Sequence, residues 1–261
     1  MVLVKKQCMN ENSWSPWRGV IWKFVLFAML GTCATFPVAM LRLDVQLFGN
    51  GVGESGAVEN TQLLLLGVCI ATLSVLAKVS PADKRFALLA AAFIGCMFVR
   101  ECDFFLNEMV PYCWQGIVTV LSASALSYSA KDARQTAQGG LRFLCTDGGA
   151  LVIPGLVVLL IYSRLIGMQG IWIQLLNDGY ARSVKNAVEE TTELLGYTVI
   201  SFSIAVGVIQ RIATVRRKNA ARGMLEVLEK SEAEATDLQA CATEVVETAA
   251  QGASSLPMSP K

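Results

Sequence analysis

The sequence predicts an all-α polytopic membrane protein, a transmembrane helical bundle of about six membrane-spanning helices followed by a C-terminal cytoplasmic helix. Three observations predict this class. Hydrophobic residues make up 54% of the 261 residues and charged residues only 16%, whereas soluble domains carry about 25% charged residues. The apolar residues come in blocks of roughly 18 to 22, the length at which a helix spans a bilayer. The blocks lack the alternation of polar and apolar residues that is typical of a membrane β-barrel.

Two features of the composition exclude classes of function. The formal net charge is +1, so no basic surface indicates binding to nucleic acid. The chain contains no histidine, which excludes haem ligation by histidine, histidine-based zinc sites and Ser-His or Cys-His catalysis. We therefore expect no metal site and no cofactor.

Residues 1–19 are predicted to be a cytoplasmic N-terminal segment, and the transmembrane domain follows at residues 20–217. Its first apolar run, residues 20–41, is longer than the core of about 7–15 residues in a signal peptide. We interpret this run as a retained first span, with a cleaved signal peptide as the alternative. A glycine-rich external loop, residues 42–60, follows it.

Five further apolar segments complete the predicted bundle. They cover residues 61–79, 86–106, 112–130, 149–168 and 187–212. Pro154 should kink the fifth segment, because a proline interrupts helical hydrogen bonding. Residues 131–148 are predicted to be a basic loop, in which Leu141, Phe143 and Leu144 lie along the membrane surface.

Beyond the sixth span the chain becomes acidic and rich in alanine. Residues 218–251 predict an amphipathic cytoplasmic helix. Its loosely spaced apolar face comprises Met224, Leu225, Leu228, Leu238, Val245 and Val246. Such a face suits a second copy of the chain or another membrane protein, and a solvated helix without a partner is the alternative. Residues 252–261 are predicted to be disordered.

The distribution of lysine and arginine predicts the orientation. These residues concentrate in the N-terminal segment, in alternate connections and after the sixth span: Lys5, Lys6, Arg18, Lys78, Lys84, Arg85, Lys131, Arg134, Arg142, Arg211, Arg216, Arg217, Lys218 and Arg222. Because basic connections remain in the cytoplasm, both termini are predicted to lie there. The chain is thus predicted to be a multi-pass protein of an inner (cytoplasmic) membrane, with the lipid bilayer as its partner.

Three apolar segments carry ionisable residues that should reach the same depth in the outer leaflet. At about 1.5 Å per residue, Arg100, Arg164 and Glu193 lie in the outer part of a hydrocarbon core about 30 Å thick. Ionisable groups at this depth are costly unless they pair or line a wet cavity, so they mark the candidate site. We call this set the charged layer: Arg100, Glu101, Asp103, Arg164, Glu189, Glu190, Glu193 and Tyr197.

Within the charged layer we expect Arg100 to pair with Glu193, or with Glu190 one turn away. Adjacent residues on a helix point about 100° apart, which disfavours a pair between Arg100 and Glu101. Asp103, three residues beyond Arg100, should share its stripe on the helix.

The charged layer is compatible with three functions. In the first, interhelical ion pairs fix the packing of a protein with a structural or scaffold-like role. In the second, a water-filled vestibule serves a small permease or channel-like protein for a proton, a cation or a cationic solute. In the third, paired carboxylates act in a membrane-embedded enzyme. No motif supplies a nucleophile, so no catalytic residue is assigned. A charged layer that water reaches favours a transport function, whereas a layer without water and with all charges paired favours a structural role.

The eight cysteines show no metal-binding spacing. Cys102 and Cys113 lie at facing ends of neighbouring predicted spans on the outer side. An oxidising compartment would join them as a disulfide, and two free thiols are the alternative. Cys8, Cys145 and Cys241 are predicted to be cytoplasmic and reduced.

Overall fold

The computed structural model describes the backbone of residues 16–48, 56–103, 106–107, 112–179 and 181–254. Side chains are described over the same ranges, except at residues 16, 18, 47–48, 178 and 231–254. Within these ranges every regular element is a helix, which confirms the predicted all-α class.

All six predicted apolar segments are helical, with somewhat different bounds. They form α2 (Pro16–Phe48), α3 (Ala57–Val79), α4 (Lys84–Glu101), α6 (Cys113–Ala130), a fifth segment between Asp147 and Ile166, and α12 (Arg182–Ser254). α11 (Gln169–Leu176) and a 3-10 turn, η2 (Asn177–Gly179), connect the fifth segment to α12.

Four stretches of the described chain are long and apolar enough to cross a membrane. They are Gly19–Gln46, Ala57–Val79, Asp147–Ile166 and Arg182–Lys230. The other two helices are more polar: α4 carries charged residues at both ends, and α6 contains four serines among its 18 residues. The chain is therefore an all-helical protein with four candidate membrane spans in the part that the structure describes.

The chain divides into two compact units, Met1–Ile212 and Ala213–Lys261. The first unit contains the helical bundle and the charged layer. The second unit consists of the distal part of α12, on which Met224, Leu225 and Leu228 are exposed.

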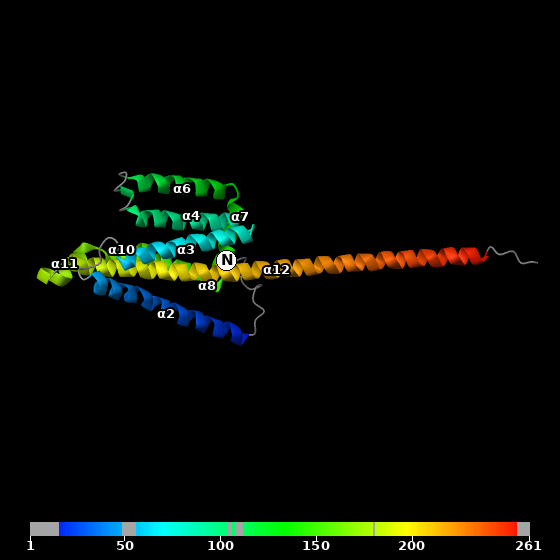
Figure 1. Cartoon of the computed structure of the whole chain (residues 1–261), viewed down its shortest axis with the longest axis horizontal. Helices are drawn as coiled ribbons and strands as arrows, with labels where there is room; N and C mark the ends of the chain where they lie inside the picture. Colours follow the sequence, from blue (N-terminus) through cyan, green and yellow to red (C-terminus); the bar gives the residue numbers. More distant parts are fainter. Residues whose placement is uncertain (1–15, 49–55, 104–105, 108–111, 180, 255–261) are drawn as a thin grey trace, which may run out of the picture. The chain divides into compact units, whose positions relative to one another are not determined.

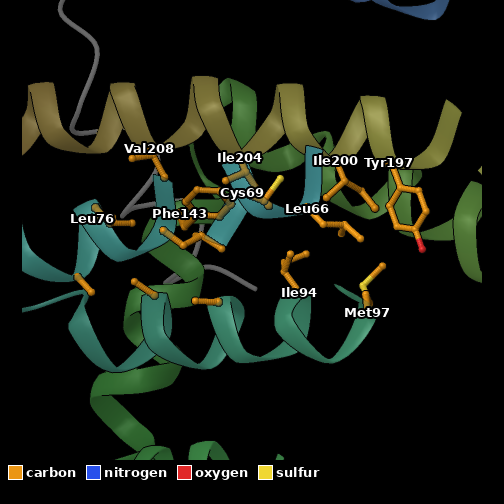
Figure 2. Packing of buried hydrophobic residues seen from close by; sticks show 14 of the residues in the cluster. Leu66, Cys69, Leu76, Ile94, Met97, Phe143, Tyr197, Ile200, Ile204 and Val208 are labelled. Atoms are coloured by element: carbon orange, nitrogen blue, oxygen red, sulfur yellow. The ribbon is translucent and has the colours of Figure 1, made fainter. Parts of the chain in front are cut away.

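The core of the first unit lies where α12 packs against α3 and α4. Figure 2 shows its buried side chains: Tyr197, Ile200, Ile204 and Val208 from α12, Leu66, Cys69 and Leu76 from α3, and Ile94 and Met97 from α4. α3, α4 and α6 lie side by side in that order (Figure 1). Because lipid tails are as apolar as these side chains, close packing and buried polar contacts hold such helices together.

Two glycines allow the fifth segment to approach α12 closely. A Cβ atom added at Gly148 would lie 2.4 Å from the backbone nitrogen of Gly207. One added at Gly196 would lie 2.8 Å from the Cβ atom of Leu159. Small residues at helix contacts are typical of membrane bundles, because they let the backbones approach.

The fifth segment is interrupted near the predicted kink at Pro154. It consists of α8 (Asp147–Ala150), α9 (Val152–Val157), a π-helical turn η1 (Val158–Tyr162) and α10 (Ser163–Ile166). The break lies at Leu151, one turn before Pro154, because the proline has no N–H to offer the carbonyl of Ala150. The π turn widens the helix by one residue and changes the face on which later side chains lie. Arg164 lies two residues beyond the π turn, on α10.

The prediction of a basic loop at residues 131–148 is wrong, because most of it forms helix α7 (Ala133–Leu144). The Asp132 side chain caps the first turn of this helix. Phe143 is buried in the core of the first unit rather than lying along the membrane surface. Leu141 and Leu144 are exposed and remain the candidates for surface contact.

α2 meets the bundle through Asp44. Its carboxylate accepts hydrogen bonds from the backbone N–H groups of Ala57 (2.6 Å) and Val58 (3.1 Å). These groups open α3, where the first N–H groups lack partners within the helix and the helix dipole favours negative charge. Gly56 is needed beside them, because a Cβ atom there would lie 2.8 Å from the Asp44 carboxylate.

Candidate functional site: the charged layer

The charged layer gathers at one end of the first unit. Arg100 and Glu101 are the last residues of α4, and Arg164 lies on α10. Glu189, Glu190, Glu193 and Tyr197 occupy the first turns of α12. Contacts between these helices decide how far the charges are paired.

The central ion pair of the layer joins Arg164 to Glu193, with 2.9 Å between Nη2 and Oε1. Glu193 is only 6% exposed, whereas the Arg164 side chain is 50% exposed. Arg164 also lies 3.7 Å from Glu189, which Lys185 contacts at 2.7 Å. The pair thus places a half-exposed cation on a buried carboxylate.

A second group joins Arg100 to its sequence neighbour Glu101, with 2.6 Å between Nη2 and Oε1. The hydroxyl of Tyr197, which is buried, donates to the same oxygen at 2.5 Å. The predicted pair between Arg100 and Glu193 is therefore wrong. Its premise failed because α4 ends at Glu101, so the two long side chains leave the last turn and can curl toward each other.

The helix is interrupted at Cys102, between Arg100 and Asp103 of the predicted stripe, and Asp103 is helical again. α4 was expected to continue to about residue 106, but its C-cap is Cys102. Asp103 lies beyond this cap and is exposed. It does not join the buried part of the charged layer.

Glu190 has different contacts from the other acidic residues of the charged layer. Its carboxylate accepts a hydrogen bond from Nε2 of Gln62 at 3.4 Å, and the same nitrogen lies 3.4 Å from the Glu190 backbone carbonyl. Gln62 is 0% exposed. Gln62 could not be singled out from the sequence, because one glutamine in an apolar span forms no spacing pattern with other polar residues.

Cys102 and Cys113 take one of the two states left open for them, whereas Cys145 differs from its predicted state. Cys102 and Cys113 are free thiols, so the disulfide between them is not formed. Cys145 was expected to be reduced, but it is disulfide-bonded. Cys8 and the side chain of Cys241 lie outside the described residues.

A second polar cluster was missed by sequence reasoning and lies at the opposite end of α4. Asp83 accepts hydrogen bonds from Ser80 (2.8 Å), from Arg142 of α7 (2.8 Å) and from Arg211 of α12 (2.9 Å). Arg142 also donates to the carbonyl of Ala82 at 2.8 Å. We call these contacts the Asp83 clamp, because they join the α3–α4 turn to two other helices.

Both Asp83 and Arg211 are buried, at 1% and 4% exposure. Burial alone would raise the pKa of Asp83, but its hydrogen bonds and the positive charge of Arg211 outweigh burial and hold the pKa below its ordinary value. A signal for this cluster was present in the sequence. Asp83 is the one acid in a basic turn, and Arg211 lies inside the apolar segment 187–212.

Among the side chains that the structure describes, no three histidine, cysteine or acidic residues converge in a way that could hold a metal ion. No protein-family model, curated protein or solved structure matches the chain. The contacts within the charged layer and the Asp83 clamp are therefore the observations that bear on function.

Proposed function

We propose that this protein is an integral membrane protein in which the charged layer fixes the packing of the helices, a structural or scaffold-like role without catalysis. The observation that best supports this role is the ion pair between Arg164 and Glu193. A carboxylate that serves a water-filled pathway has to reach water, whereas Glu193 is buried and its oxygen lies 2.9 Å from a guanidinium nitrogen. Ionisable groups at membrane depth become tolerable when they pair in this way.

The second group of the layer supports the same role. Tyr197 is buried on α12 and Glu101 lies on α4, so their hydrogen bond connects two helices of the core. Removing one member of a buried pair leaves the other uncompensated, which is costly even where the pair itself contributes little net stability.

A double-mutant cycle tests the structural role. Arg164→Gln and Glu193→Gln should each lower the melting temperature of the purified protein, and the double variant should lose less than the sum of the two. The expected coupling is about 1 kcal/mol, at the low end for contacting residues because Arg164 is half exposed. Asp103→Asn is the matched control, since Asp103 is exposed and outside the buried cluster, and it should leave the melting temperature unchanged.

The same variants distinguish structure from transport. In reconstituted vesicles a structural protein should not dissipate a proton or cation gradient faster than protein-free vesicles do. If Glu193→Gln folds like the original chain and abolishes such a flux, the structural proposal is overturned.

A small permease for a proton or a cation is the second candidate, and one observation favours it. Apart from the exposed Asp103, the layer contains four carboxylates, from Glu101, Glu189, Glu190 and Glu193. Three cations oppose them: Arg100 and Arg164 of the layer, and Lys185, which lies outside the layer and contacts Glu189. The excess of one negative charge would be neutralised by a bound cation or proton.

We further propose that α4 and α6 complete a bundle of six spans in an inner membrane, with both termini in the cytoplasm. α4 packs along α3, which is long and apolar enough to span, and α6 packs along α4. Helices that run together in this way share one depth. The basic residues Lys84, Lys131 and Arg134 then gather on one side, as expected for cytoplasmic connections. The bonded Cys145 would suit an oxidising side instead, so the orientation calls for a direct test.

The exposed apolar residues of the second unit suggest a contact with a second copy of this chain. Met224 and Leu228 are one turn apart, as in the seam of a coiled coil. In a background without other cysteines, Leu228→Cys should cross-link to a second copy under oxidation in detergent. Glu229→Cys, which points about 100° away, should cross-link much less. Equal yields at the two positions would contradict a specific seam.

A further inference from the structure

Glu190 differs from the other buried members of the charged layer. Among the described residues it forms no ion pair, and its carboxylate is hydrogen-bonded only by the Gln62 amide. The groups that interact with it electrostatically are other acids, Glu193 on its own helix, Glu101 on α4 and Glu59 on α3. Like charges so close together disfavour a further negative charge.

The neighbouring cations contact acidic residues other than Glu190. Arg100 contacts Glu101, Arg164 contacts Glu193, and Lys185 contacts Glu189. A Glu190 carboxylate would thus add negative charge to a site whose cations are already engaged.

Gln62 supplies the second, independent observation. It is 0% exposed, and its Oε1 atom is buried without a hydrogen-bond partner. A buried acceptor left without a donor typically costs about 1–3 kcal/mol. An amide can donate to a carboxylate through its nitrogen or accept from a carboxylic acid through its oxygen. A protonated Glu190 would therefore provide the donor that Oε1 lacks.

We propose that Glu190 is a proton-binding site in the membrane, with Gln62 as its hydrogen-bond partner in both protonation states. A proton from water adds to a carboxylate oxygen of Glu190, forms an O–H bond and removes one negative charge from the layer. The new O–H group donates to Oε1 of Gln62, and loss of the proton returns the amide nitrogen to the carboxylate. The inference is independent of the structural role of Arg164 and Glu193, and it identifies the ion that a permease would use.

A proton fits this site better than a metal ion. Calcium takes about 6–8 oxygen ligands, and magnesium requires near-octahedral geometry. The described acidic residues form no metal-binding group, and Glu190 and Gln62 together offer few oxygens. A single carboxylate beside one amide is sufficient for a proton.

Infrared spectroscopy of the full chain in dodecyl maltoside micelles tests the proposal, because this detergent has no carbonyl group and only a protonated carboxyl then gives the carbonyl stretch of a carboxylic acid. The original chain should show this band at about pH 6 to 7, where a solvated glutamate has lost its proton. Glu190→Gln, which is neutral and nearly isosteric, should remove the band. Glu189→Gln is the matched control, because Glu189 is ion-paired, and it should retain the band. Identical spectra for the original chain and Glu190→Gln would overturn the proposal.

Two further variants and a salt titration keep the test decisive if Glu190→Gln does not fold. Glu190→Asp keeps the carboxyl and should keep a band at an altered frequency. Gln62→Leu should also shift the frequency, since the acid loses its acceptor, and an unchanged frequency would contradict the role of Gln62. Adding sodium or calcium chloride at constant pH should leave the band intact. Its loss on addition of either salt would assign a metal ion to the site in place of the proton.

Discussion

At the scale of single residues, Asp83 combines deep burial with two arginine partners. Its chain position in a short turn gives it little conformational freedom, and Ser80 fixes one carboxylate oxygen from within the same turn. Arg142 and Arg211 approach from separate helices. A change at this one side chain therefore affects three connections at once.

We expect Asp83→Asn to destabilise the folded protein by about 3–5 kcal/mol, because it leaves buried guanidinium groups without this carboxylate. Thermal unfolding in detergent measures the effect. Asp132→Asn is the matched control, since Asp132 is an exposed N-cap residue, and asparagine caps a helix about as well as aspartate, so the unfolding free energy should hardly change. Equally small changes at both positions would contradict a stabilising role of the Asp83 clamp.

The pH dependence of stability follows from the lowered pKa of Asp83. The clamp should stabilise the fold at all pH values above about 4, the ordinary pKa of an unfolded aspartate. This contribution should be lost as the pH falls through the lower pKa of the folded state. Melting temperatures of the original chain and Asp83→Asn should therefore converge in strong acid, and a gap that persists there would contradict the linkage.

Tyr197→Phe removes the hydroxyl that binds Glu101 while leaving the Arg100–Glu101 pair in place. A hydrogen bond to a charged group contributes about 1.5–3 kcal/mol, so we expect a loss of that size in unfolding free energy. The loss should largely vanish in a Glu101→Leu background, which lacks the acceptor. A full additional loss in that background would show that the hydroxyl stabilises the fold through a group other than Glu101.

At the scale of elements, the sequence predicted where helices occur better than where they end. Apolar blocks of bilayer length are a strong signal, so all six segments are helical. The interruption at Cys102 was not predicted, because Leu106 continues the apolar pattern beyond it. The π turn at Val158–Tyr162 has no sequence signature, since valine, leucine and isoleucine suit any buried helix. α7 was missed because its polar face and Gly139-Gly140 resemble a loop.

The close approach of the fifth segment to α12 yields a prediction at this scale. Gly148→Ala should cost about 1–3 kcal/mol of unfolding free energy, because its methyl group would meet backbone that cannot rotate away. Gly67→Ala is the matched control. A Cβ atom there meets nothing within 4 Å, and alanine should leave α3 unchanged or stabilise it by up to about 1 kcal/mol. Similar effects at both glycines would rule out a packing cause.

At the scale of the whole molecule, orientation could be predicted only from the distribution of lysine and arginine. The prediction is tested with single cysteines introduced into a cysteine-free chain. Ser183→Cys, at the end that carries the charged layer, should react with a membrane-impermeant maleimide in intact cells. Lys84→Cys, at the end that carries the Asp83 clamp, should react only after permeabilisation. The opposite pattern would place both termini outside the cytoplasm.

Asp83 and Arg211 are 128 positions apart along the chain, which has a consequence for biosynthesis. The α3–α4 turn leaves the ribosome long before the helix that supplies Arg211, so the nascent chain carries an incompletely neutralised carboxylate at the membrane surface. A chain that terminates before Arg211 never completes this contact, whereas one that terminates after Arg211 still can. The ion pair therefore divides truncated chains into those that lack the cation for Asp83 from the last span and those that contain it.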